Sequence, residues 1–217
     1  MTPSKEVDKN KQQKAPQHGV VRPIVSEGHP ALRQMSEEVP LSEISGAKIQ
    51  GLITDMKKSL ASQDDGIGLA APQIGVPLRI FIVSKRIFHT HEDKKTSEKT
   101  ASKEGSTPAV TAKAPALDDL VFINPTITKY SKEKKWMEGE GCLSVRWVYG
   151  KVQRSTKVTI RAYDEKGRVF ERGAGGLLAH IFQHEVDHLN GILFIDKAKD
   201  LEEVEPAEVK KSRKRVK

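Results

Sequence analysis

The sequence predicts an α+β fold, because segments with strand patterns are followed by one long helix near the C-terminus. Strand patterns occur at residues 78–83 and 120–123 and in a hairpin formed by residues 158–163 and 168–171. The long helix covers about residues 176–190 and is apolar around most of its circumference. At 217 residues with 36% hydrophobic content, the chain can bury one sizeable core, and nothing in the sequence requires two.

Local patterns place the remaining elements. Residues 23–39 are expected to form an irregular lead-in, and residues 44–61 an amphipathic helix. The helix prediction rests on apolar residues at helical spacing, namely Ile49, Leu52, Ile53, Met56 and Leu60. Asp64-Asp65-Gly66 is a turn signal that ends this helix, and residues 164–167 form the turn of the hairpin.

The composition divides the chain into one globular domain and several polar segments. Residues 21–200 are expected to form the domain, with an insertion at about 88–118 that has no aromatic residue after its first position. Such a polar segment cannot bury enough apolar surface to offset its chain entropy. We therefore expect the insertion to be disordered. Residues 1–20 are expected to be a disordered extension without a targeting-peptide pattern. Residues 201–217 form a charged tail, and no stretch approaches the ~20 apolar residues of a membrane span.

Residues 184–188, His-Glu-Val-Asp-His, predict a metal site with its own proton acceptor. His184 and His188 are four residues apart, so on a helix both imidazoles lie on one face and can bind the same cation. Glu185 projects beside them and could take a proton from a bound water. The alternative is a helix with two surface histidines. The largely apolar surrounding sequence is typical of a buried helix and favours the metal site.

The same helix carries a third histidine, His180, one turn before His184. His180 and His188 lie about 12 Å apart on a straight helix, so His180 is predicted to neighbour the site without binding the metal. A catalytic site needs a third protein ligand. The continuation His-Glu-x-x-His-x-x-Gly-x-x-His, used by one protease class, fails here because Phe194 stands where the last histidine should be.

Cys142 is the candidate for the third ligand. It is the only cysteine, so it cannot form an intramolecular disulfide, and it follows glycines that let the backbone approach a ligand closely. Free cysteines are more often packing residues. Beside a His-Glu-x-x-His helix that lacks a third ligand, metal coordination is the favoured interpretation. A thiolate with two imidazoles suits iron or zinc better than magnesium or calcium.

Three segments of the chain resemble the three motifs of the peptide deformylase family, in the family's order. They are residues 66–73 (Gly-Ile-Gly-Leu-Ala-Ala-Pro-Gln), 140–144 (Glu-Gly-Cys-Leu-Ser) and 183–189 (Gln-His-Glu-Val-Asp-His-Leu). The similarity runs from about Val21 to Lys197 and is interrupted by the insertion. The resemblance implies an α+β fold in which antiparallel β-sheets pack around a central helix carrying the two histidines.

The resemblance also implies the chemistry of the site. Cys142, His184 and His188 resemble the family's three metal ligands, and Glu185 resembles its general acid/base. The family's usual metal is Fe²⁺, for which Zn²⁺, Ni²⁺ or Co²⁺ can substitute. The implied reaction removes the formyl group from the N-terminal N-formylmethionine of newly made polypeptides and releases formate. A metal-bound hydroxide would attack the formyl carbon, with Glu185 transferring the proton.

Other positions match the family in part. Gln73 and the backbone N–H of Leu143 match its oxyanion stabilisers, and Gly68 matches the glycine that lets the first loop pass close to the substrate. Two positions depart from the pattern: Arg146 replaces a proline found in many members, and Tyr149 replaces a basic residue that binds the substrate backbone in some. Both departures concern peptide binding rather than the metal chemistry.

Two further predictions concern side chains, the first of which rests on the substrate that the resemblance implies. Ile67, Leu177 and Ile181 could line an apolar pocket for the methionine side chain, although apolar residues at such positions are more often ordinary core. Asp187 is expected to face away from the ligands and to need a buried partner, for which Arg154 is the candidate.

The net charge of +8 lies largely in the tail, since the last eight residues hold six positive charges. The tail is either a solvated terminus or a segment attracted to ribosomal RNA where nascent chains emerge. A bacterial cytoplasm is the simplest expectation for one reduced thiol without a targeting peptide, with an organelle as the alternative. The protein is expected to be a monomer. Two other functions remain open: a metallopeptidase of another family, and a non-catalytic ribosome-associated relative.

Overall fold

The computed structural model describes residues 19–88 and 118–204. The predicted insertion at 88–118, nearly all of the predicted extension at 1–20 and the end of the charged tail lie outside these residues. Within them, neither α-helix is long and apolar enough to cross a membrane.

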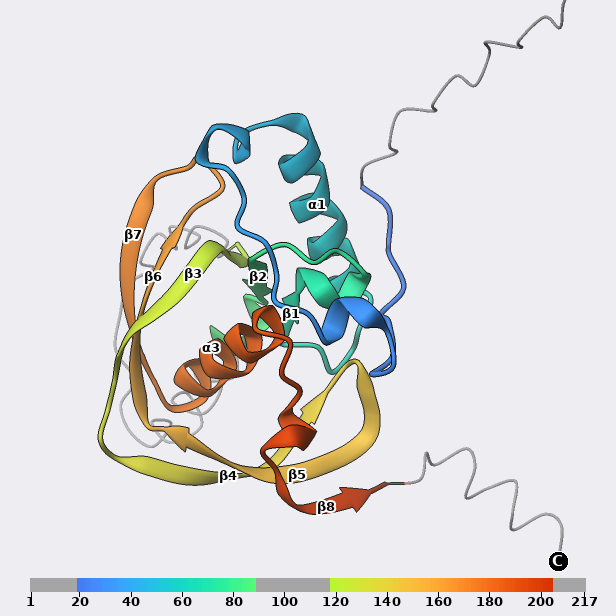
Figure 1. Ribbon diagram of the computed structural model, residues 1–217, viewed down its shortest axis with the longest axis vertical. Helices are drawn as coiled ribbons and strands as arrows, with labels where there is room; N and C mark the ends of the chain where they lie inside the picture. Colours follow the sequence, from blue (N-terminus) through green and yellow to red (C-terminus); the bar gives the residue numbers. More distant parts are fainter. Residues whose placement is uncertain (1–18, 89–117, 205–217) are drawn as a thin grey trace, which may run out of the picture.

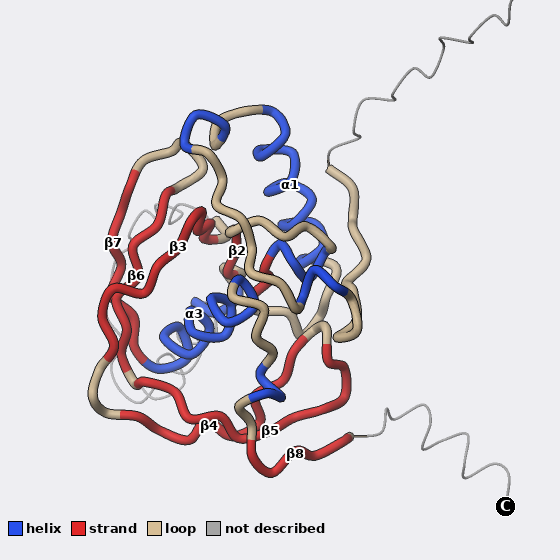
Figure 2. Tube along the Cα trace, viewed as in Figure 1, coloured by secondary structure: helices blue, strands red, loops and turns tan. Residues whose placement is uncertain are grey.

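The described chain forms two antiparallel sheets. The larger has the order β1-β2-β3-β6-β7, with bounds Gly68–Ala70, Ile80–Val83, Leu120–Tyr130, Lys157–Tyr163 and Val169–Gly175. The smaller has the order β4-β5-β8, with bounds Lys134–Cys142, Val145–Ser155 and Lys199–Glu203. The chain passes from one sheet to the other between β3 and β4 and again between β5 and β6, so the sheets are continuous along one side of the molecule (Figure 2).

Helix α3, Gly176–Leu189, lies between the two sheets (Figure 1). Its apolar side chains pack against the larger sheet, where Phe182 meets Phe122 with ring centroids 4.8 Å apart. Phe122 in turn stacks on Phe81 at 4.6 Å. Because Phe81, Phe122 and Phe182 are almost completely buried, this packing fixes the rotation of α3 and therefore the direction of its histidines.

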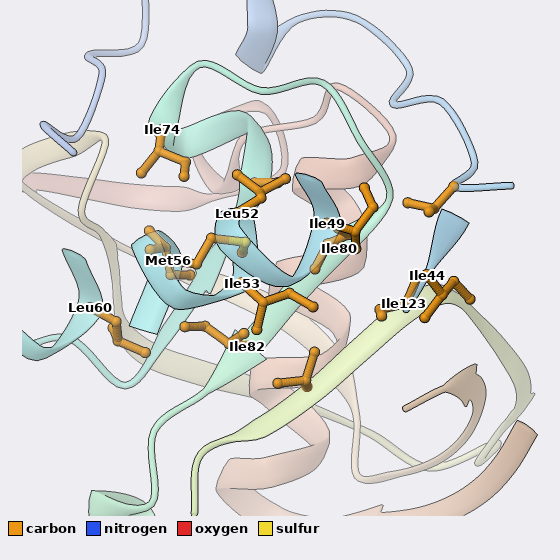
Figure 3. Packing of buried hydrophobic residues seen from close by; sticks show 14 residues of the cluster. Ile44, Ile49, Leu52, Ile53, Met56, Leu60, Ile74, Ile80, Ile82 and Ile123 are labelled. Carbon is orange, nitrogen blue, oxygen red and sulfur yellow. The ribbon is translucent and has the colours of Figure 1, made fainter. Parts of the chain in front are cut away.

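Helix α1, Ala47–Ala61, packs on the opposite face of the larger sheet, over β1, β2 and the start of β3 (Figure 1). Figure 3 shows its apolar face, including Ile49, Ile53 and Met56, packed against Ile80 and Ile82 of β2. The spacing of these side chains follows the helical period, which is why the sequence identifies the helix. The packing holds β1 and the short turn after it against α3.

The structure confirms the α+β class and the packing of antiparallel sheets around the helix with the two histidines. The predicted helix at 44–61 begins three residues later, and the predicted strand at 120–123 continues to Tyr130. The hairpin is present, with β6 and β7 in register from Tyr163–Val169 to Lys157–Gly175. Strands β4, β5 and β8 were not predicted, and β8 extends past residue 200, where the domain was expected to end.

A buried carboxylate fastens the start of the described chain to α1. Asp55, whose side chain is fully buried, accepts hydrogen bonds from the backbone N–H groups of Gly19 (2.6 Å) and Val20 (3.0 Å) and from Arg22 Nε (2.8 Å). Burial by itself would raise the pKa of Asp55, but these hydrogen bonds outweigh it and lower the pKa below its ordinary value. The ionised form therefore stabilises the folded state.

Replacing Asp55 with asparagine is expected to lower the free energy of unfolding at pH 7 by about 1.5–3 kcal/mol, since it weakens hydrogen bonds to a charged acceptor. The lowered folded-state pKa makes this contribution present above the unfolded pKa of about 3.9 and lost as pH falls towards the folded value. Denaturant unfolding of both proteins from pH 7 to pH 2.5 should show the gap closing below about pH 4. A gap that stays constant over this range would contradict the assignment.

Candidate active site

Three potential metal ligands meet where β4 ends against α3. Sγ of Cys142 lies 3.2 Å from Nε2 of His188, and one ligand atom from each of Cys142, His184 and His188 falls within 4.8 Å of the others. The two rings are nearly perpendicular, with centroids 4.8 Å apart, as expected for residues one turn apart. The structure therefore brings together the three residues that the sequence nominated as ligands.

The end of β4 aims the thiol at the helix. Cys142 is the last residue of the strand and pairs with Val145 across a tight turn. Within that turn, the backbone N–H of Ser144 lies 3.4 Å from Sγ and donates to it. A backbone N–H directed at sulfur favours the thiolate over the thiol. The thiolate is the form that binds metals.

Glu140, two residues before the cysteine, orients one histidine. Its Oε1 accepts a hydrogen bond from Nδ1 of His184 at 2.7 Å, and its Oε2 lies 2.5 Å from Nε2 of His180. Because Nδ1 of His184 carries the proton, Nε2 keeps its lone pair for a cation. His180 thus neighbours the site through Glu140, in agreement with the prediction that it is not a ligand.

A buried arginine connects Glu140 to the other side of α3. Arg154 on β5 binds both carboxylate oxygens of Glu140, at 3.1 and 2.5 Å, and donates to Asp187 at 2.6 Å. Asp187 also accepts from Lys197 at 2.6 Å. The predicted pair between Arg154 and Asp187 is confirmed. Every charge in this chain of contacts has an opposite partner, which a buried ionic group requires.

The protonation states fit a metal site. Burial would raise the pKa of Glu140, but hydrogen bonds from His180, His184 and Arg154 hold it well below its ordinary range. Burial, followed by the electrostatic effect of the neighbouring His184, keeps the pKa of His188 well below its ordinary value, so the His188 ring is neutral and can act as a ligand. Burial also raises the pKa of Cys142 to about 12. A coordinated cation supplies the positive charge that would stabilise the Cys142 thiolate.

Glu185 stands beside the three ligands and is almost completely buried. Burial, followed by the negative charge of Glu140, raises its pKa well above the ordinary value. Its Oε2 is buried without a hydrogen-bond partner among the described residues, and Glu185 helps to line the adjacent cavity. A carboxylate in this position can exchange a proton with a molecule in the cavity.

Gly68 makes room for that carboxylate. A Cβ built on Gly68 would overlap Oε1 of Glu185 and approach Ile181 to 3.3 Å. The first residue of β1 is therefore glycine because Glu185 occupies the space beside it. The sequence analysis predicted that Gly68 lets the loop approach the substrate closely. The close contact that the structure shows at Gly68 is with Glu185.

Gln73 presents its amide group to the site. Oε1 accepts a hydrogen bond from the N–H of Ala70 at 2.8 Å, which fixes the amide orientation. Nε2 then points at Sγ of Cys142 and Oγ of Ser144, each 3.5 Å away. Gln73 is placed by the short 3₁₀ turn η3, Ala71–Ile74, that follows β1. Leu143 lines the same cavity, so the two predicted oxyanion donors lie beside the metal-ligand cluster.

The cavity has a volume of about 380 Å³ and opens between the loop before β1 and the β4–β5 turn. Ile67, Leu177 and Ile181, the predicted pocket residues, all lie in its wall. Ile67 and Leu177 are about 40% exposed (38% and 42%), so they are not ordinary core residues. The wall combines apolar side chains with the Cys142–His184–Glu185 edge, as small-molecule and peptide sites do.

Sequence reasoning missed the role of Glu140. An acidic residue between two glycines immediately before the candidate thiol was a usable signal, because a carboxylate commonly orients a metal-binding histidine. The pairing of Glu140 with His184 depends on the β4–β5 hairpin, which was not predicted either.

The antiparallel sheets, the Cys-His-His cluster and the adjacent carboxylate place the protein among metal-dependent hydrolases that use a His-Glu-x-x-His helix. Comparison with known families makes this specific. The polypeptide deformylase family model matches residues 21–204, so the chain belongs to that family.

Relatives in plants and bacteria agree. Peptide deformylase 1A, chloroplastic/mitochondrial, of Arabidopsis thaliana is 40% identical over 174 residues, which cover 80% of this chain and 60% of the relative. Peptide deformylase 2 of Clostridium perfringens is 37% identical over 184 residues, which cover 85% of this chain and 97% of the relative. The chain therefore spans less than two thirds of the plant relative and nearly the whole bacterial one.

Solved structures share the fold. A class I type b peptide deformylase from Acinetobacter baumannii, solved with Met-Ala-Ser bound, superposes with a TM-score of 0.64 at 30% identity, covering 82% of this chain and 99% of that one. A peptide deformylase from Legionella pneumophila gives a TM-score of 0.63 at 32% identity, covering 90% and 92%.

The Glu140–His184 contact gives a testable prediction. Glu140→Gln removes the charge that orients the imidazole, so metal affinity should fall about 10–100-fold, as measured by competition with a chromophoric chelator. The matched control is Glu138→Gln on the same strand, because Glu138 is exposed and pairs only loosely with Lys151 at 3.6 Å. Equal metal affinity of Glu140→Gln and the unmodified protein would contradict the orienting role.

Proposed function

We propose that this protein is a peptide deformylase, which hydrolyses the formyl amide of N-formylmethionine at the start of new polypeptides and releases formate. The observation that carries the proposal is the position of Glu185, which is buried beside the ligand cluster and Gly68 in the wall of the cavity, with one carboxylate oxygen unpaired among the described residues. Family membership supports the substrate class. The Met-Ala-Ser peptide bound to the Acinetobacter baumannii relative supports a site for a methionyl peptide.

We assign metal binding to Cys142, His184 and His188 and propose Fe²⁺ as the native ion, with Zn²⁺, Ni²⁺ or Co²⁺ as substitutes. The mixed thiolate and imidazole donor set supports iron or zinc over magnesium or calcium. A divalent cation held there would polarise the substrate carbonyl and lower the pKa of a coordinated water towards neutrality. Glu140 holds His184 ready for this role.

The chain's own residues supply the proton transfers and the oxyanion donors. Glu185 accepts a proton from the attacking water and passes it to the departing amine. The Nε2 group of Gln73 and the N–H of Leu143 would donate hydrogen bonds to the carbonyl oxygen as negative charge develops on it. Each such donor typically stabilises the transition state by about 2.7–4 kcal/mol. Gly68 contributes indirectly, because it leaves the space that Glu185 needs.

The substrate side chain and the cellular setting follow from the same assignment. Ile67, Leu177 and Ile181 form the apolar wall that would receive the methionine side chain. We infer that the protein acts as a monomer in a bacterial cytoplasm, where formylated chains are made, with an organelle as the alternative. The basic residues 210–217 would bring it to ribosomal RNA by charge attraction.

Glu185→Ala should lower kcat for a formyl-Met tripeptide by about 10²–10⁴-fold, because it removes the proton acceptor and leaves the ligands in place. Formate release measures turnover, and metal content measured on the same samples is the control for site integrity. The proposed role fails if the variant keeps full metal content and turns over within about tenfold of the unmodified protein.

A further inference from the structure

A three-residue bulge forms part of the cavity mouth. On β4, Gly141 and Cys142 are adjacent, but their partners on β5 are Tyr149 and Val145. Residues 146–148 therefore have no partner on β4 where β5 passes the cavity, and all three line the cavity. Bulges of this kind commonly redirect a side chain beside an active site.

The middle residue of the bulge has a backbone conformation that its side chain disfavours. Trp147 has φ +66°, in the left-handed region where a bulky residue costs free energy that glycine would not. Its side chain is 48% exposed, so it contributes little to the core in return. Trp147 therefore holds a large, exposed aromatic side chain at the cavity mouth at a cost in backbone free energy. This combination indicates a function for the side chain.

The surroundings hold the bulge in place. Arg146 pairs with Asp65 at 3.3 Å and also binds Gln63, and both partners belong to the loop that leads into β1. On the other side, the N–H of Val204 donates to the carbonyl oxygen of Trp147 at 2.7 Å. Arg146 thus ties the two walls of the cavity mouth together, and the backbone of Trp147 is also held by Val204, which follows β8.

From this geometry we infer that Trp147 is a specificity-determining residue, which packs against the peptide side chains that follow the formylated methionine. The inference rests on the proposed deformylase function. A half-exposed indole offers a large apolar face and a polar edge, which suits an extended peptide whose sequence varies. Peptides with an apolar second or third residue should gain the most binding affinity from this contact. Formylmethionine without a following peptide should gain none.

The test compares Trp147→Gly with the unmodified protein on formyl-Met-Leu-Phe and on formyl-Met alone. Glycine is the sharpest substitution, because it removes the indole and accepts the positive φ without strain. We expect KM for the tripeptide to rise about tenfold with kcat unchanged, and both constants for formyl-Met to stay unchanged. The melting temperature should be equal or higher, which separates a binding role from a structural one.

Trp136→Gly is the matched control, because Trp136 is 46% exposed, lies outside the cavity lining and stacks under Lys199 on the outer strands. It should leave KM unchanged for both substrates. Equal KM for Trp147→Gly and the unmodified protein on the tripeptide would overturn the inference, as would equal losses on the two substrates.

A binding measurement separates this inference from the proposed function. In a Trp136→Phe background, Trp147 fluorescence should change on adding Met-Leu-Phe and not on adding methionine. If the unmodified protein releases no formate, the proposed function fails while this signal still decides the role of Trp147. Fluorescence that does not respond to the peptide would overturn the inference even in an active enzyme.

Discussion

The carboxylate of Glu140 is the group on which the geometry of the site depends. It accepts hydrogen bonds from His180 and His184 on α3 and two from Arg154 on β5, so three side chains from two elements converge on one carboxylate. A carboxylate this deeply buried is stable only when its charge is fully compensated, and the low pKa of Glu140 reflects that compensation. The same contacts orient His184 and hold the end of β4, with its cysteine, against the helix.

This arrangement explains why the site lies between the two sheets. The larger sheet fixes α3 through Phe182 and its aromatic neighbours, and the smaller sheet supplies Cys142 and Glu140. Arg154 and Asp187 join the smaller sheet to the helix on the side away from the cavity. The ligands are therefore placed by two rigid elements rather than by loops, which is what a preorganised catalytic site requires. The mouth of the cavity is built differently, from the loop that leads into β1 and the bulge on β5.

The sequence predicts the parts of the molecule that depend on local spacing. The pair His184 and His188 follows from the helical period, and α1 follows from its apolar stripe. The link from the helix to Cys142 spans more than 40 residues and rests instead on donor chemistry, because Cys142 is the only cysteine, and on motif order. Strands β4 and β8 could not be predicted, because β4 is mostly exposed and β8 entirely so, which leaves no alternation of apolar and polar residues to read. Without β4, the inward direction of Glu140 could not be predicted either.

The central claim is that one sulfur and two imidazole nitrogens bind a single divalent cation. X-ray absorption on the Zn²⁺-loaded protein tests it most directly, because sulfur and nitrogen scatterers differ in distance. The account predicts one sulfur at about 2.3 Å and two histidine nitrogens at about 2.0–2.1 Å, with the sulfur shell lost in Cys142→Ser. A first shell of nitrogen and oxygen alone in the unmodified protein would contradict it.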